Sequence, residues 1–220
     1  MPAECLYDTV QLQYSRFISA APFALSALHI VNDPSIPVHT NFTVRIKPDR
    51  AIPEAWKNKL LIQRNFRSSV RKAVWVGEWL SARFGDFGSF QLFADTLPPE
   101  MDELLNLGNI PGSGDTIDLS PANRIVFRPT DNFGVIKNFR AELNGKWLRF
   151  TNDKGSAFIY NFDERCPYGV HHLKVIVEDL AGNFTTKEWW FKRFPYTPPP
   201  KKKLNGKKRM NTSNKKTGYK

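Results

Sequence analysis

Two adjacent histidines lie a few residues ahead of a Glu-Asp pair in the stretch "YGVHHLKVIVEDLAGN" (168–183), and all of these residue types are common metal ligands. Whether they can share one ion depends on the local structure, because a strand sends successive side chains to opposite faces. Every second residue from Leu173 to Val177 is Leu or Val, which predicts a strand. His171 and His172 then point away from each other. We therefore expect no metal site here and no bound cofactor.

The end of the same stretch predicts a turn, because Ala181-Gly182-Asn183 follows the alternating residues. Asp179 stands just before this turn, where its carboxylate can accept backbone hydrogen bonds. We interpret Asp179 as a turn former rather than as a metal ligand.

The positive charge of the chain is concentrated at its end. The formal charge is +11, and residues 201–220 hold nine Lys or Arg and no acid, so 11 minus 9 leaves +2 for the other residues. This composition, introduced by three prolines, predicts a disordered tail. The tail is either a solvated extension or an anchor to a polyanion, whether nucleic acid, anionic lipid or an anionic cell-wall polymer. The candidate polyanion contacts are Lys201, Lys202, Lys203, Lys207, Lys208, Arg209, Lys215 and Lys216.

Several classes of protein are disfavoured by the composition. No run of about 18 apolar residues occurs, so we expect no transmembrane segment. The first residues lack a charged start followed by an apolar stretch, so we expect no signal peptide in this chain. Cys5 and Cys166 match neither a disulfide framework nor the spacing of metal ligands.

Alternation of apolar and polar residues recurs along the whole chain, whereas helical periodicity is nearly absent. These runs predict strands at 6–14, 42–46, 59–65, 72–76, 79–84, 89–93, 124–128, 138–143, 146–150, 157–162, 171–178 and 185–191. Asn144-Gly145 favours a two-residue hairpin turn, because both positions tolerate positive φ. Many short strands at this spacing predict an all-β fold of antiparallel sandwiches.

An internal similarity favours two such units. The stretch "VWVGEWLSARF" (74–84) resembles "AELNGKWLRF" (141–150), and in each a tryptophan follows a glycine turn. We predict that Trp79 and Trp147 occupy equivalent core positions. Proline and the loss of alternation near Asp95 to Pro99 mark a linker. The predicted units are an immunoglobulin-like sandwich at 1–97, a second at 98–195, and a disordered tail at 196–220.

Two adjacent tryptophans lie in the last predicted strand, within "EWWFKRF" (188–194). Trp189 and Trp190 should point to opposite faces, so we expect one in the core and one exposed. An exposed tryptophan near Lys192 and Arg193 is a candidate contact for a sugar ring or a neighbouring domain, and half-buried packing at the edge is the alternative.

Three stretches carry a resemblance to a known family: "IPVHTNFTVRIKPDR", "WLSARFGDFGSFQLFADTLPP" and "DNFGVIKNFRAELNGKWLRFTNDKGSAFIYNFDERCPYGVHHLKVIVEDLAGN". Together they are similar to the region that follows the catalytic domain in envelope-associated lysostaphin-like (LytM-type) zinc metallopeptidases of some Gram-negative bacteria. The resemblance covers most of the first 195 residues. It implies a pair of immunoglobulin-like sandwiches attached to a cell-wall hydrolase, in the periplasm or at the cell envelope.

The catalytic motifs of that family are not carried over. The family binds zinc through H-x-x-x-D and a later H-x-H, with a further histidine nearby. His29 and Asp33 match the first spacing, but no H-x-H follows, and the chain has four histidines in total. We expect no catalytic residue in this chain.

The sequence thus predicts a non-catalytic accessory region of a cell-envelope peptidoglycan metalloendopeptidase. It would position the enzyme or bind an envelope partner, and its partners would be the peptidase catalytic domain, peptidoglycan or another envelope component. The alternative is a free-standing protein that binds nucleic acid or membrane through its basic tail. A third possibility is an unrecognised hydrolase, whose active site would require two carboxylates brought together from separate loops.

Overall fold

The computed structural model describes residues 3–65, 69–102, 104, 116–154 and 157–198. Strands dominate this part of the chain, and its helices are two 3-10 turns, η1 (Ala3–Cys5) and η2 (Glu54–Trp56). None of the described helices is long and apolar enough to cross a membrane. The strands are β1 (Tyr14–Phe17), β2 (Leu28–Val31), β3 (Phe42–Ile46), β4 (Leu60–Arg64), β5 (Ser69–Lys72), β6 (Val74–Val76), β7 (Trp79–Phe84), β8 (Gly88–Ala94), β9 (Thr116–Asp118), β10 (Arg124–Phe127), β11 (Ile136–Leu143), β12 (Lys146–Leu148), β13 (Thr151–Asp153), β14 (Ala157–Asn161), β15 (Gly169–Asp179) and β16 (Phe184–Arg193).

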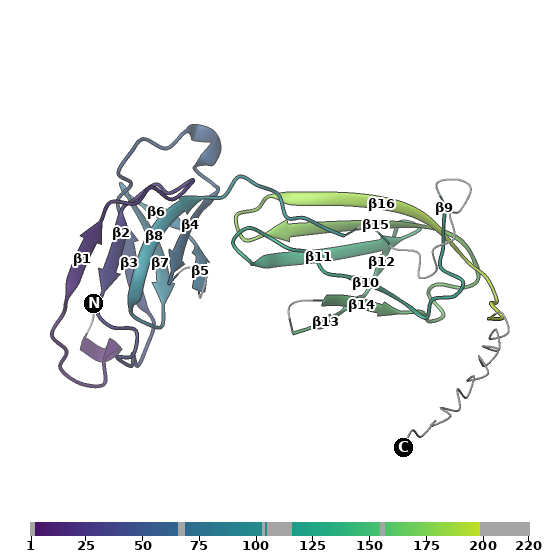
Figure 1. Ribbon diagram of the computed structural model, residues 1–220, viewed down its shortest axis with the longest axis horizontal. Helices are drawn as coiled ribbons and strands as arrows, with labels where there is room; N and C mark the ends of the chain where they lie inside the picture. Colours follow the sequence, from purple (N-terminus) through teal and green to yellow (C-terminus); the bar gives the residue numbers. More distant parts are fainter. Residues whose placement is uncertain (1–2, 66–68, 103, 105–115, 155–156, 199–220) are drawn as a thin grey trace, which may run out of the picture.

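The strands form two sandwiches, one on each side of Asp95. Strands β1 to β8 make sheets of order β1-β2-β8-β4-β5 and β3-β7-β6, which we call the first sandwich. Strands β9 to β16 make sheets of order β12-β11-β15-β16-β9 and β10-β14-β13, which we call the second sandwich. Figure 1 shows the two bodies side by side, with their strands running in different directions. The predicted all-β fold of tandem immunoglobulin-like sandwiches is confirmed.

The two sandwiches share one strand order. Strands β5, β4 and β8 of the first correspond to β12, β11 and β15 of the second, and β3, β7 and β6 correspond to β10, β14 and β13. The second sandwich thereby has the arrangement of an immunoglobulin domain, with the strands B, E and D facing C, F and G. The difference lies beside β8 and β15, the strands that correspond to strand F of an immunoglobulin domain. There the first sandwich uses its own β2, antiparallel to β8, whereas the second uses β16, which also pairs in parallel with β9.

Each sandwich buries its own apolar core between its sheets. The first core is rich in phenylalanine, with Phe84 packed edge to face on Phe90 at a centroid distance of 5.0 Å. In the second core Phe127 stacks on Trp189 at 5.2 Å. Both cysteines are free thiols buried in these cores. Alternate burial along β15 shows why the sequence folds this way, because Leu173, Val175 and Val177 all face inward.

The prediction that Trp79 and Trp147 lie in the two cores is wrong. Their side chains are 46% and 63% exposed, and the leucine that follows each tryptophan is the buried residue. The reason is the hairpin register: Trp79 pairs with Val76 and Trp147 with Glu142, so each tryptophan takes the solvent face and its successor takes the core face. The two segments are also not equivalent, because β7 lies in a three-stranded sheet and β12 at the edge of a five-stranded one.

Other sequence expectations had mixed outcomes. The hairpin at Asn144-Gly145 is confirmed, since Leu143 pairs with Lys146 and the two turn residues have φ of 51° and 78°. A strand at 6–14 is wrong, because Leu6 forms only an isolated bridge and β1 begins at Tyr14. The single strand expected at 72–76 is two strands in different sheets. Strands β2, β9 and β13 were not predicted.

The sandwiches meet at what we call the joint, which contains the end of β8 and the loops that precede β11 and follow β15. Phe93 of the first sandwich packs edge to face on Phe133 of the second, with 5.5 Å between ring centroids. Two lysines of the first sandwich reach across, Lys59 Nζ to the carbonyl of Gly182 at 2.6 Å and Lys72 Nζ to that of Ala181 at 3.1 Å. Apolar packing and charged hydrogen bonds therefore both fix the joint.

Candidate functional site

The adjacent histidines lie on opposite faces of β15, as expected. His171 is buried, and its ring nitrogens contact the carbonyl of Pro167 at 2.8 Å and the side chain of Asn144 at 3.0 Å. His172 faces outward and its Nε2 lies 3.0 Å from Glu188 Oε2. Each imidazole thus has partners of its own, and the two cannot hold one ion together.

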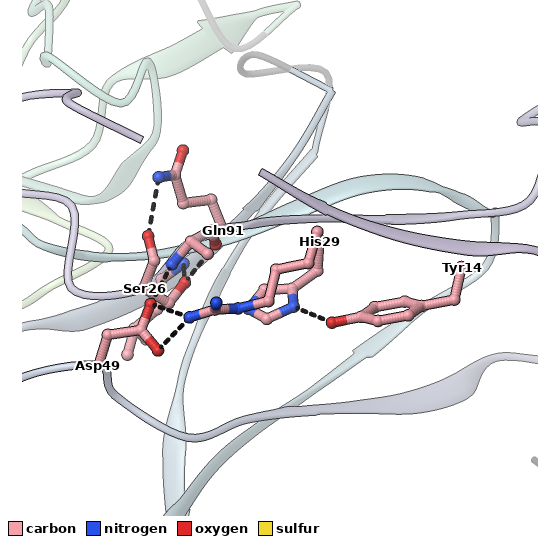
Figure 2. A network of polar contacts seen from close by, with 8 residues as sticks. Tyr14, Ser26, His29, Asp49 and Gln91 are labelled. Carbon is pink, nitrogen blue, oxygen red and sulfur yellow. Dashed lines mark hydrogen bonds and ion pairs between the residues drawn. The ribbon is translucent and has the colours of Figure 1, made fainter. Parts of the chain in front are cut away.

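His29 belongs to a different polar network, which Figure 2 shows. Its Nδ1 lies 2.9 Å from the hydroxyl of Tyr14, and burial together with the charge of Arg16 lowers the pKa of the imidazole. Asp33, four residues on, instead accepts a hydrogen bond from the backbone N–H of Ser35 at 2.7 Å. The match to H-x-x-x-D therefore has no counterpart in a shared site.

The rest of that network ties the N-terminal strands to the sheet. Asp49 accepts hydrogen bonds from Arg16 Nη2 at 2.9 Å and from the N–H of Ala27 at 2.6 Å. Ser26 accepts from the N–H of Leu92 at 3.0 Å, and its own carbonyl accepts from Gln91 Nε2 at 3.0 Å (Figure 2). This arrangement anchors β1 and β2 and offers no free nucleophile.

The two tryptophans of β16 divide between core and surface. Trp189 is buried against Phe127, whereas Trp190 is 52% exposed and its ring lies 4.9 Å from that of His172. Their opposite burial follows from the alternation expected of a strand. The role of Trp190 as a contact for sugar or partner stays a prediction.

Trp190 belongs to the solvent face of the five-stranded sheet in the second sandwich. The register aligns Trp147 with Glu142, Glu142 with Lys174, and Lys174 with Glu188, in one row across four strands. His172 and Trp190 form the next row. We call this surface the aromatic-ionic face, and it consists of Glu142, Trp147, His172, Lys174, Glu188 and Trp190.

Ion pairs hold the polar side chains of the aromatic-ionic face in place. Glu188 accepts from both neighbours, with Lys174 Nζ at 3.2 Å and His172 Nε2 at 3.0 Å, and the hydrogen bond from Lys174 holds the pKa of Glu188 below its usual value. Arg140 pairs with Glu142 at 2.8 Å. Strand spacing places Trp147 and Trp190 roughly 15 Å apart, one on each side of this polar band.

The joint also brings three carboxylates together, which the sequence analysis did not predict. One oxygen from each of Asp95, Asp131 and Asp179 lies within 4.8 Å of the others. Asp95 and Asp179 are only 1% and 0% exposed, so they cannot reach a substrate, and the hydrolase reading gains no support. A shared signal was present, since Asp95 and Asp179 each lie within two residues after the end of a predicted strand, at 89–93 and 171–178.

A hollow of about 570 Å³ lies beside the joint. Phe17, Phe23, Phe93 and Phe133 line it together with polar side chains that include Gln91. Its size and its mostly apolar lining are both typical of small-ligand sites. The predicted tail contacts, from Lys201 to Lys216, lie outside the described residues.

Comparisons with known proteins extend these observations. Residues 1–95 match the family model of the Zu5-like domain, and this match ends at the residue that follows β8. No curated protein matches the chain. Among solved structures, the chain is similar to the fibronectin(III)-like modules of CbhA from Clostridium thermocellum, with 12% identity over 69% of this chain and 85% of that one and a TM-score of 0.29.

Proposed function

We propose that this chain is a non-catalytic module that binds the glycan of the cell envelope through its aromatic-ionic face and positions a lysostaphin-like zinc peptidase there. The aromatic-ionic face carries the glycan part of the proposal, because it combines two exposed indoles with a fixed band of charges. The peptidase part rests on the three stretches that resemble the region after the catalytic domain of such enzymes.

The chemistry of the face suits a carbohydrate. An exposed indole offers a flat apolar surface that can stack on the C–H face of a sugar ring, and neighbouring charged groups can bond to its hydroxyl and amide groups. Trp190 is fixed by its contact with His172, and Lys174 and Glu188 are fixed by their ion pair. Preorganised side chains of this kind lose little conformational freedom on binding, which favours affinity.

The absence of a catalytic role is part of the proposal. Within residues 3–65, 69–102, 104, 116–154 and 157–198, the histidines have separate partners, and the converging carboxylates include two that are fully buried. A peptidase would therefore supply its zinc chemistry from another domain, and this chain would hold that domain near its substrate.

Sedimentation with insoluble purified peptidoglycan tests the glycan-binding role. Trp190→Ala and Trp147→Ala should each weaken binding about tenfold, the loss expected when one stacking contact is removed. Trp79→Ala is the matched control, because Trp79 has similar exposure but lies in the first sandwich. Wild-type binding by both Trp190→Ala and Trp147→Ala would contradict the proposal.

The polyanion alternative makes a different prediction in the same assay. Binding through nine tail cations should fall steeply with added salt and disappear when residues 201–220 are deleted. Binding through the aromatic-ionic face should survive that deletion and depend weakly on salt. The deletion therefore separates the two functions.

A further inference from the structure

The three carboxylates at the joint come from both sandwiches. Asp95 directly follows β8 of the first, Asp131 lies between β10 and β11 of the second, and Asp179 is the last residue of β15. One oxygen of each lies within 4.8 Å of the other two. Oxygens bound to one calcium ion at about 2.4 Å can be no more than about 5 Å apart, and this cluster meets that limit.

The oxygens of this cluster differ in their partners. Both oxygens of Asp179 accept hydrogen bonds, Oδ1 from the N–H groups of Gly182 and Asn183 at 2.6 and 2.8 Å and Oδ2 from Asn183 Nδ2 at 2.7 Å, which leaves one lone pair on Oδ2 for a further partner. Asp95 Oδ2 is buried and accepts no hydrogen bond from any described residue. The same holds within the described chain for Asp131 Oδ1 and for Asn132 Oδ1, the adjacent amide oxygen.

A buried oxygen that accepts no hydrogen bond destabilises the fold, because burial removes its hydrogen bonds to water and no protein donor replaces them. The side chain of Asp95 is only 1% exposed, so solvent does not make up the loss. Its other oxygen, Oδ1, accepts from Asn132 Nδ2 at 3.1 Å and from the N–H of Leu97 at 3.3 Å. Asp95 is thus held in place with one lone-pair-bearing oxygen unused.

The charges around the cluster are also unbalanced. The nearby ammonium groups of Lys59 and Lys72 bond to the carbonyls of Gly182 and Ala181 rather than to the carboxylates. The joint therefore gathers three carboxylates that these two lysines do not pair with, which favours a cation.

We infer that the joint binds one calcium ion through Asp95, Asp131 and Asp179, with the amide oxygen of Asn132 as a further ligand. Every donor is a carboxylate or amide oxygen, which selects a hard cation over zinc or copper. Calcium suits the site better than magnesium, because it accepts irregular geometry and asymmetric ligand sets. Asp131 and Asn132 also line a surface hollow of about 230 Å³, which gives the ion a route to the cluster.

The ion would connect the two sandwiches. Asp95 is supplied by one sandwich and the other three ligands by the second, so binding would oppose any separation at the joint. Calcium would thereby set the angle between the aromatic-ionic face and the first sandwich. This inference stands on the joint alone and does not depend on the glycan-binding proposal.

Calorimetric titration of the chelator-treated full chain with calcium chloride tests the site. We expect one ion per chain and, at about 5 mM calcium, a rise in the unfolding midpoint of about 5 °C, because a ligand that binds only the folded state stabilises it. Magnesium chloride at the same concentration should give a much smaller rise. No heat and no shift with calcium, or an equal response to magnesium, would overturn the inference.

Variants locate the site. Asp95→Asn and Asp131→Asn should each weaken calcium binding at least about tenfold, since each removes one ligand charge. Asp33→Asn is the matched control, because this exposed aspartate caps a turn in the first sandwich and should leave the titration unchanged. Circular dichroism without calcium checks that each variant folds. Wild-type affinity in folded Asp95→Asn would refute the assignment.

Discussion

Asp95 and Asp179 occupy the same place in the two sandwiches, at the end of corresponding strands β8 and β15, yet their surroundings differ. Asp179 accepts three hydrogen bonds from the turn that leads into β16. Asp95 has no such turn, because the chain leaves the first sandwich there, and one of its oxygens accepts no bond from the described residues. The same residue at the same position therefore closes a hairpin in one sandwich and contributes to the joint in the other.

The difference shows how a repeated fold acquires a new site. Because the first sandwich has β2 in place of a final hairpin, Asp95, which follows β8, keeps only the N–H of Leu97 as a local donor. The loops of the second sandwich approach the same point, with Asn183 Nδ2 donating to the carbonyl of Asp95 at 3.0 Å. Fewer local hydrogen bonds and the approach of two acidic residues distant in sequence then act together on one carboxylate.

Alanine at the two positions should have the most unequal effects. Asp179→Ala leaves three partly buried donors without an acceptor and should lower the free energy of unfolding by about 3 kcal/mol. Asp95→Ala loses two hydrogen bonds but removes a carboxylate that burial destabilises, so its effect should stay within about 1 kcal/mol. Urea denaturation in chelator gives both values. Equal losses would mean that the two environments are energetically alike.

The two cores can be compared through the leucines that follow the exposed tryptophans. Leu80→Ala and Leu148→Ala each remove a fully buried side chain and should cost about 3 kcal/mol. Hydrogen exchange then shows how far the damage spreads. Loss of protection confined to one side of Asp95 indicates sandwiches that unfold separately, whereas loss on both sides indicates that the joint couples them.

The titration of Asp95 predicts a pH dependence that calcium should remove. The folded-state pKa of about 6 lies above the usual 3.8, so between these values the folded chain binds more protons than the unfolded chain. In chelator, the free energy of unfolding should therefore fall as pH rises from about 4 to about 6, by up to about 3 kcal/mol, and stay lower above that range. The carboxylates of Asp131 and Asp179 face that of Asp95, and the ammonium groups of Lys59 and Lys72 lie nearby at the joint.

Urea denaturation across this range, with and without calcium, measures the effect. Asp95→Asn cannot titrate at this position and should give a flatter profile in chelator. A wild-type profile in chelator that does not fall between pH 4 and 6 would show that the joint does not perturb Asp95 in the way that its burial indicates.

The exposed tryptophans should give the smallest effects. Trp79→Ala and Trp147→Ala remove side chains that are about half in water, so each should cost about 1 kcal/mol or less. Thermal unfolding measures the change, with Trp189→Ala as the contrasting core substitution. A loss of several kcal/mol at either exposed position would indicate that these indoles pack against something in solution.

The sequence predicted what depends on neighbouring residues. Period-two alternation identified β7, β10, β14 and most of β15 and β16, and it correctly divided His171 from His172 and Trp189 from Trp190. The hairpin at Asn144-Gly145 followed from backbone sterics. These features were accessible because each is decided within a few residues.

What the sequence missed depends on contacts between distant segments. Short strands such as β9 are fixed by a neighbour far along the chain, here β16, and carry little alternation of their own. Asp179 was correctly interpreted as a turn former, but nothing local indicates that Asp95 and Asp131 approach it. The expectation for Trp79 and Trp147 was wrong because the register of the preceding turn decides which face each residue takes, and a glycine before the tryptophan does not by itself specify that register.

The parallel pairing of β9 with β16 bears on how the molecule would carry a mechanical load. These are the first and last strands of the second sandwich, so tension on its two ends pulls them in opposite directions along their length and strains their hydrogen bonds together. In the first sandwich β1 and β8 both run antiparallel to β2, so the start of β1 and the end of β8 lie at opposite ends of the sheet, and tension between them also loads the β1–β2 bonds along the strands. Both sandwiches should therefore resist extension, and the chain would act as a stiff tether.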